Sequence, residues 1–183
     1  MHLEVSWMLA EKLAKVEAGI KRVAEKHDSL PLNAVMLFRS LILVGNELTT
    51  LLEQSIRPHG LNETEYRVLM MLFSQPDGLG HPTELCQGTA QSPANMTRLI
   101  DMLVARGMVS RTPSLEDRRR TALRITAEGE RVVNDVLPKL GNTLTRVFAD
   151  LSGAEQQKLI GQLRHLARTV DTLTEPARAD VLP

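Results

Sequence analysis

Apolar residues recur every three or four positions along most of this chain, which predicts long amphipathic helices. Helical patterns begin near residues 1, 32, 62, 126 and 152, and each break carries proline, glycine or a capping residue. Asn62 with Glu65 and Ser152 with Glu155 have the spacing of capping boxes, whereas Pro138 is expected to bend or break the helix around it. The pattern therefore predicts a mainly α-helical protein.

Two shorter helices stand close together in the middle of the chain. The first covers 82–87 and is followed by a break at Gly88, and the second covers 92–106. Ser92 can cap the second helix, Pro93 suits its first position, and Gly107 suits a left-handed exit. This spacing is typical of a helix-turn-helix.

The second of these helices has one apolar face and one polar face. Ser92, Asn95 and Arg98 fall on the polar stripe, which could face a partner. The opposite stripe, which should face the core, consists of Met96, Leu99, Ile100, Leu103 and Val104.

A small β-hairpin is predicted directly after this helix. Residues 108–112 and 121–125 are short strand-like runs, and three consecutive arginines, Arg118, Arg119 and Arg120, lie between them. In isolation such a basic run is most often a solvated turn. After a helix-turn-helix, however, it has the layout of a wing, a loop that reaches along duplex DNA while the helix enters the major groove.

The distribution of charge agrees with this interpretation. The whole chain has 22 basic and 22 acidic residues, so its net charge gives no indication of a nucleic-acid partner. Residues 81–125, in contrast, contain seven arginines and four acidic residues. A basic segment in a chain whose other residues are acidic overall is typical of a DNA-binding protein.

The remaining composition narrows the class further. The single cysteine excludes an internal disulfide, and the sequence shows neither a signal peptide nor an unbroken apolar run long enough to span a membrane, so we expect a cytoplasmic protein that contacts no membrane. Aromatic residues make up only 3%, which favours double-stranded DNA over stacked single strands. The five histidines are scattered, so we expect neither a metal nor a cofactor.

The first, second and last long helices carry more apolar surface than one small winged domain could cover. A homodimer would bury it, although a monomeric helical bundle stays possible. The residues that we expect at this dimer seam are Leu9, Leu13, Leu159, Leu163, Leu166 and Val170.

Taken in order, these segments resemble the MarR (multiple antibiotic resistance regulator) family, over roughly residues 32–173. The quoted segments are 60–66 (GLNETEY), 82–86 (PTELC), 95–101 (NMTRLID), 116–120 (EDRRR) and 123–129 (LRITAEG). The resemblance is greatest to the branch that represses multidrug efflux operons. It implies a winged helix-turn-helix with an α-helical dimerisation region, bound to DNA in the bacterial nucleoid.

The resemblance also implies roles for particular residues. Arg98 matches the recognition-helix arginine, Ser92, Asn95 and Thr97 match positions near bases or phosphates, and Asp117 and Arg119 match the wing. Family members commonly bind a small, aromatic, often anionic effector between the dimer helices and the winged domain. The residues that we expect in that region are His59, Tyr66 and Arg67.

The expected organisation is dimerisation helices at 1–57, the winged domain at 61–125 with its wing at 108–125, further dimerisation helices at 126–174, and a frayed tail at 175–183.

Three alternative functions remain. Cys86 could sense oxidants, although a buried, inert thiol fits its place inside a helix better. The winged module could serve protein assembly without reading bases. An enzyme is disfavoured, because no nucleophile elbow, phosphate loop or acidic pair is present.

Overall fold

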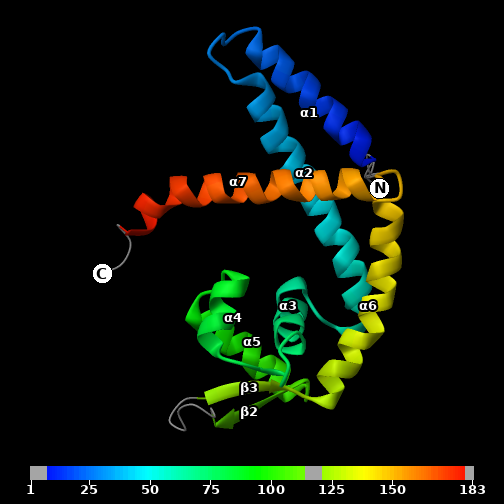
Figure 1. The fold of residues 1–183 in the computed structure, drawn as a ribbon, viewed down its shortest axis with the longest axis vertical. Helices are drawn as coiled ribbons and strands as arrows, with labels where there is room; N and C mark the ends of the chain where they lie inside the picture. Colours follow the sequence, from blue (N-terminus) through cyan, green and yellow to red (C-terminus); the bar gives the residue numbers. More distant parts are fainter. Residues whose placement is uncertain (1–7, 114–120, 180–183) are drawn as a thin grey trace, which may run out of the picture. The chain divides into compact units, whose positions relative to one another are not determined.

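The computed structural model describes residues 8–113 and 121–179, with side chains as far as Thr174. It falls into two compact units, residues 1–139 and 140–183. The elements of the first unit, in chain order, are α1 (Leu9–Ala24), α2 (Leu32–Ile56), the 3-10 turn η1 (Arg57–His59), α3 (Glu63–Phe73), β1 (Leu79–Gly80), α4 (Pro82–Thr89), α5 (Pro93–Ala105), β2 (Val109–Pro113) and β3 (Thr121–Ile125) (Figure 1). Helix α6 (Ala127–Val147) continues from the first unit into the second, and α7 (Gly153–Ala179) completes the chain.

Helices α1 and α2 form a hairpin whose two members lie side by side (Figure 1). No residue of α1 is buried, and in α2 only Ile56 is. Leu37 and Phe38 on α2 are 65% and 61% exposed. The apolar stripes predicted for these helices are therefore only partly covered.

The apolar character of α2 extends through η1. The stretch Leu32–His59 is long and apolar enough to cross a membrane, with a window of mean hydropathy 1.5, although it contains no unbroken apolar run of that length. One such helix is weak evidence for a membrane, because helices of soluble proteins also reach this composition. Four charged residues interrupt the stretch, at Arg39, Glu47, Glu53 and Arg57.

The winged domain has its own core and a small antiparallel sheet. Strands β2 and β3 pair from Val109 with Ile125 to Pro113 with Thr121, as the two strand-like runs predicted. The sequence pattern missed β1, two residues that pair with the other edge of β3. Helices α3, α4 and α5 pack with these strands (Figure 1). Fully buried side chains in this domain include Leu69, Leu72, Leu85, Met96, Leu103 and Leu123.

The turn between α4 and α5 differs from the predicted one. We expected the break at Gly88, but α4 continues to Thr89, and Ala90 adopts the left-handed conformation with φ of 53°. Gly88 serves another purpose, because a Cβ there would lie 2.4 Å from the terminal methyl carbon of Met71. Gly88 leaves room for the end of the flexible Met71 side chain on α3, and this contact cannot be read from the local sequence.

The two predicted capping boxes are confirmed, whereas α6 and α7 both continue past the prolines at which a break or fraying was expected. The side chain of Asn62 accepts from the backbone of Glu65 while the Glu65 carboxylate accepts from the backbone of Asn62, and Ser152 and Glu155 form the equivalent pair. Helix α6 is not broken at Pro138. The backbone of α7 stays helical to Ala179, so the tail does not begin to fray at 175 as predicted, because a proline near a helix end removes only one hydrogen bond.

The start of α6 is packed tightly against the strands. A Cβ on Gly129 would lie 2.3 Å from the backbone oxygen of Met108 and 2.8 Å from Cγ1 of Ile125. Gly129→Ala is therefore expected to lower the free energy of unfolding by about 1–3 kcal/mol. At Gly141, on the same helix, no atom lies within 4 Å of an added Cβ. Gly141→Ala should therefore raise the free energy of unfolding by about 0.5–1 kcal/mol, because alanine favours the helix over glycine.

Urea unfolding of the two variants beside the parent measures this difference. Equal unfolding midpoints for Gly129→Ala and Gly141→Ala would contradict the close approach of α6 to the strands.

Candidate nucleic-acid interface

The recognition helix predicted at 92–106 is α5, and its two faces are as expected. Met96, Leu99, Ile100 and Leu103 are buried. All four residues that we assigned to DNA on this helix, Ser92, Asn95, Thr97 and Arg98, are exposed. The apolar face anchors the helix in the domain core and leaves the polar face open to a partner.

Two of these four side chains also serve the helix itself. The Ser92 hydroxyl accepts a hydrogen bond from the backbone N–H of Asn95 at 3.3 Å, which caps the N-terminus of α5. The Thr97 hydroxyl donates to the carbonyl of Pro93 at 2.9 Å. Asn95 and Arg98 carry the longer polar side chains of this surface, and therefore have the greater reach towards base edges.

The base of the wing is fastened to the rest of the domain by arginines. An ion pair between Arg111 on β2 and Asp101 on α5 ties the first wing strand to the recognition helix. Arg124 on β3 donates to the carbonyl of Asp77 at 2.7 Å, in the turn before β1. Strand β2 is thus tied to α5, and β3 to the turn before β1.

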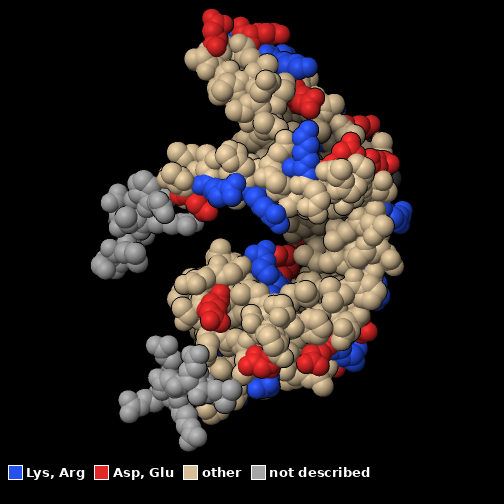
Figure 2. Space-filling model, viewed as in Figure 1, with Lys and Arg blue, Asp and Glu red and all other residues tan. Residues whose placement is uncertain are grey.

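The tip of the predicted wing, with Asp117, Arg118, Arg119 and Arg120, lies outside the described residues. Over the described residues on the face seen in Figure 2, basic and acidic side chains are interspersed and form no expanse of one charge. Of the charged residues in 81–125, the segment 114–120 contributes three arginines and two acidic residues, and the described residues contribute four arginines and two acidic residues.

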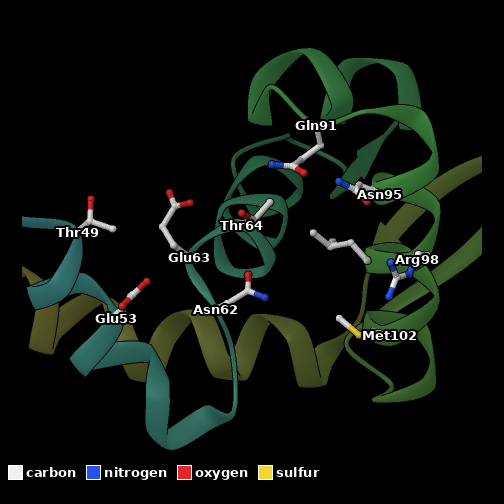
Figure 3. Close-up of a pocket in the computed structure, with 10 residues that line it drawn as sticks. Thr49, Glu53, Asn62, Glu63, Thr64, Gln91, Asn95, Arg98 and Met102 are labelled. Carbon is white, nitrogen blue, oxygen red and sulfur yellow. The ribbon is translucent and has the colours of Figure 1, made fainter. Parts of the chain in front are cut away.

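A cavity of about 440 Å³ opens beside Arg98. Its lining comes from α2, α3 and α5 and from the segments just before α3 and α5, and Asn95 and Arg98 border it from the recognition helix (Figure 3). Its chemistry is mixed, because Leu99 and Met102 add apolar surface to carboxylates, amides and hydroxyls. The other lining residues are Thr49, Glu53, Asn62, Glu63, Thr64 and Gln91.

None of the three residues predicted near an effector lines this cavity. Arg67 is held on the surface of α3 by Glu63, one turn earlier. Tyr66 is only 4% exposed, and burial raises the pKa of its phenol, so the hydroxyl stays protonated near neutral pH. The Tyr66 hydroxyl and Nε2 of His59 are buried and have no hydrogen-bond partner within the part of the chain that the structure describes.

The sequence reading missed the role of Arg106, the residue that ends α5. Its guanidinium donates to the carbonyl oxygens of His59 and Gly60, 47 and 46 residues earlier in the chain. It also lies 3.8 Å from the buried carboxylate of Glu65. The glycine at position 60 was the local sequence sign of a turn here, and in the structure it adopts a left-handed φ of 64°.

The features that would suggest other chemistry are limited. Cys86 is half-buried, not fully buried as we expected. It follows the buried Leu85 in α4, so its side chain points away from the centre of the buried face. Within residues 8–113 and 121–174, no group of three or more His, Cys, Asp and Glu side chains could hold a metal ion.

Comparison with known proteins agrees with this architecture. Residues 59–120 match the MarR family. The transcriptional repressor MprA of Escherichia coli is 29% identical over 160 residues, which cover 87% of this chain and 91% of that protein.

Solved structures show the same fold. A MarR family transcriptional regulator from Streptomyces coelicolor, crystallised in complex with DNA, superposes with a TM-score of 0.69 at 23% identity, over 76% of this chain and 89% of that one. CouR from Rhodococcus jostii, crystallised with p-coumaroyl-CoA, gives a TM-score of 0.61 at 25% identity, over 74% and 90%. These relatives are transcription regulators and not enzymes. The family match across the helix-turn-helix, together with a repressor aligned over most of both chains, is consistent with a MarR-family winged-helix transcriptional regulator.

Proposed function

We propose that this protein is a homodimeric repressor that binds a palindromic duplex operator and is released from it by a small aromatic or lipophilic effector. The observation that carries the proposal is the exposed polar face of α5, whose apolar face is anchored in the core. The regulated genes would be efflux or stress genes, as in the branch that the sequence resembles.

In this proposal α5 enters the major groove and the wing follows the backbone. Arg98 can reach a guanine edge with two donors, and Asn95 can pair with adenine. The arginines of the wing tip would contact phosphates or a narrow minor groove, where guanidinium groups are favoured. In a twofold dimer the two recognition helices would read half-sites about one helical turn, roughly 10 bp, apart.

The exposed apolar stripes of α2 and α7 support the proposal that the protein is a homodimer. Leu37, Phe38 and Leu41 on α2 are 65%, 61% and 44% exposed, and Leu163 and Leu166 on α7 are 42% and 44% exposed. Surfaces of this kind on a soluble protein usually mark an interface, and most soluble oligomers are twofold dimers.

The effector would bind between α2 and the winged domain. The cavity beside Arg98 has about the volume of a small ligand. The buried Tyr66 hydroxyl and His59 Nε2, which have no hydrogen-bond partner among the described residues, lie outside its lining and offer an alternative pair of polar anchors. A site with an apolar wall and a few polar groups suits a planar weak acid. A ligand bordered by Asn95 and Arg98 would also obstruct the DNA-facing surface directly.

The DNA-binding part is tested by selecting duplexes from a random pool and measuring their affinities across a salt titration. Arg98→Ala should weaken binding to the selected duplex by about 1–3 kcal/mol and relax the preference at one base position, because it removes a base contact. Arg119→Ala should weaken binding to all duplexes alike and reduce the salt slope by about one, because it removes a phosphate contact.

Arg131→Ala is the matched control, since Arg131 is an exposed arginine paired only with Glu128 and Asp135 of its own helix. Parent-like affinity of Arg119→Ala at every salt concentration would contradict the wing assignment. Failure of the parent to select any duplex would favour the protein-assembly module instead.

A further inference from the structure

Arg106 joins two parts of the chain that have separate tasks in the proposed function. It is the C-cap of α5, the helix that carries the DNA-facing side chains. Its partners lie where α2 ends, at η1 and Gly60. Helix α2 carries the exposed apolar stripe. The guanidinium therefore connects the recognition helix with the helix that we expect at the dimer interface.

The geometry at this joint is specific for an arginine. Nη1 donates to the Gly60 carbonyl at 2.8 Å, and Nη2 donates to the His59 carbonyl. Carbonyl groups at a helix end lack partners within the helix, and a cation there is also favoured by the helix dipole. The forked guanidinium can satisfy two such carbonyls at once, which the single ammonium of lysine does less well.

The surrounding residues keep the joint in shape. Glu65 lies 3.8 Å from the Arg106 guanidinium, is 4% exposed, and holds the backbone N–H of Asn62 at the start of α3. Gly60 has φ of 64°, and a Cβ there would lie 3.3 Å from Nη2 of Arg106. The side chain of Arg106 is 33% exposed, so the joint is partly shielded from water.

We propose that Arg106 is a positioning residue for DNA binding, one that fixes the orientation of α5 relative to the end of α2. This inference rests on the proposed function, because in a homodimer that orientation sets the separation of the two recognition helices. Loss of the guanidinium leaves each helix folded but lets its angle to α2 vary. The protein then accepts a wider range of half-site spacings.

The experiment compares the parent, Arg106→Ala, Arg106→Lys and the control Arg131→Ala on three duplexes. The first duplex is the one selected by the parent, and the others have a central spacer one base pair longer or shorter. One base pair rotates the half-sites by roughly a tenth of a turn, so the parent should bind the altered duplexes at least about tenfold more weakly. Arg106→Ala should bind the selected duplex about tenfold more weakly, as expected for lost charged hydrogen bonds.

The decisive readout is the spacing preference, the ratio of affinities for the selected and altered duplexes. In Arg106→Ala this ratio should fall at least about threefold, which is a smaller effect than the loss of affinity for the selected duplex. In Arg106→Lys the ratio should lie between those of the parent and Arg106→Ala. A residue that only stabilised the fold would weaken all three duplexes equally. Thermal unfolding shows whether each variant is folded at the temperature of the assay, and Arg106→Lys provides the test if Arg106→Ala does not fold.

The outcomes separate the two proposals. Unchanged spacing preference in folded Arg106 variants would overturn the positioning role alone. A parent that selects no duplex would overturn the proposed function, and this inference with it.

Discussion

Replacing both Leu163 and Leu166 with Glu is expected to convert the protein from dimers to monomers. Both side chains lie on the apolar stripe of α7 and are 42% and 44% exposed. If a second copy covers them, the two substitutions bury four carboxylates in the dimer, and each unpaired buried charge costs several kcal/mol. Sedimentation velocity at micromolar concentration should then show the monomer mass. Affinity for a palindromic duplex should fall by at least about a hundredfold, because one half-site is lost.

A matched control adds the same charge to the opposite side of the helix. Gln157 and Thr172 are exposed and lie away from the apolar stripe of α7. Gln157→Glu with Thr172→Glu should therefore sediment as the parent does. A stable dimer of the Leu163→Glu, Leu166→Glu protein would mean that this stripe is not part of the seam, and a monomeric parent would refute the homodimer.

A saturating effector is expected to weaken operator binding about a hundredfold. Such an effector must prefer the form incompatible with DNA by about 2.7 kcal/mol, and by linkage the operator must weaken effector binding by the same factor. Fluorescence titration with phenolic acids and lipophilic weak-acid uncouplers, with and without the selected duplex, measures both sides of this equality. Equal effector affinity in the two titrations would refute release through this site. Failure of every compound to bind would favour a constitutive DNA-binding protein.

Two substitutions locate the effector. Tyr66→Phe removes a buried hydroxyl that has no partner, so it should leave the free energy of unfolding unchanged or higher. If that hydroxyl anchors the effector, the same variant should bind it about tenfold more weakly, as expected for one lost hydrogen bond. Met102→Ala instead enlarges the cavity beside Arg98. Weaker effector binding in Met102→Ala alone would place the ligand in that cavity, away from Tyr66.

Local sequence determined the helices of this protein and the faces of the recognition helix. The bounds of α2 and the capping of α3, α5 and α7 follow from residues within a few positions of each helix end. The buried and exposed stripes of α5 follow from a period of 3.6 residues, which brought Asn95 and Arg98 to the surface. These features were predictable because hydrogen bonding within a helix and apolar periodicity act over short distances along the chain.

Tertiary structure alone decided the features that depend on residues far apart in sequence. The left-handed turn falls on Ala90, and Gly88 instead lies inside α4 against the Met71 side chain of α3. Strand β1 exists only as a partner of β3, more than 40 residues later. Arg106 looked like an ordinary surface arginine until the fold brought the carbonyls of His59 and Gly60 beside it. Steric contact and hydrogen bonding between distant segments have no local periodicity, so no pattern in the sequence could indicate them.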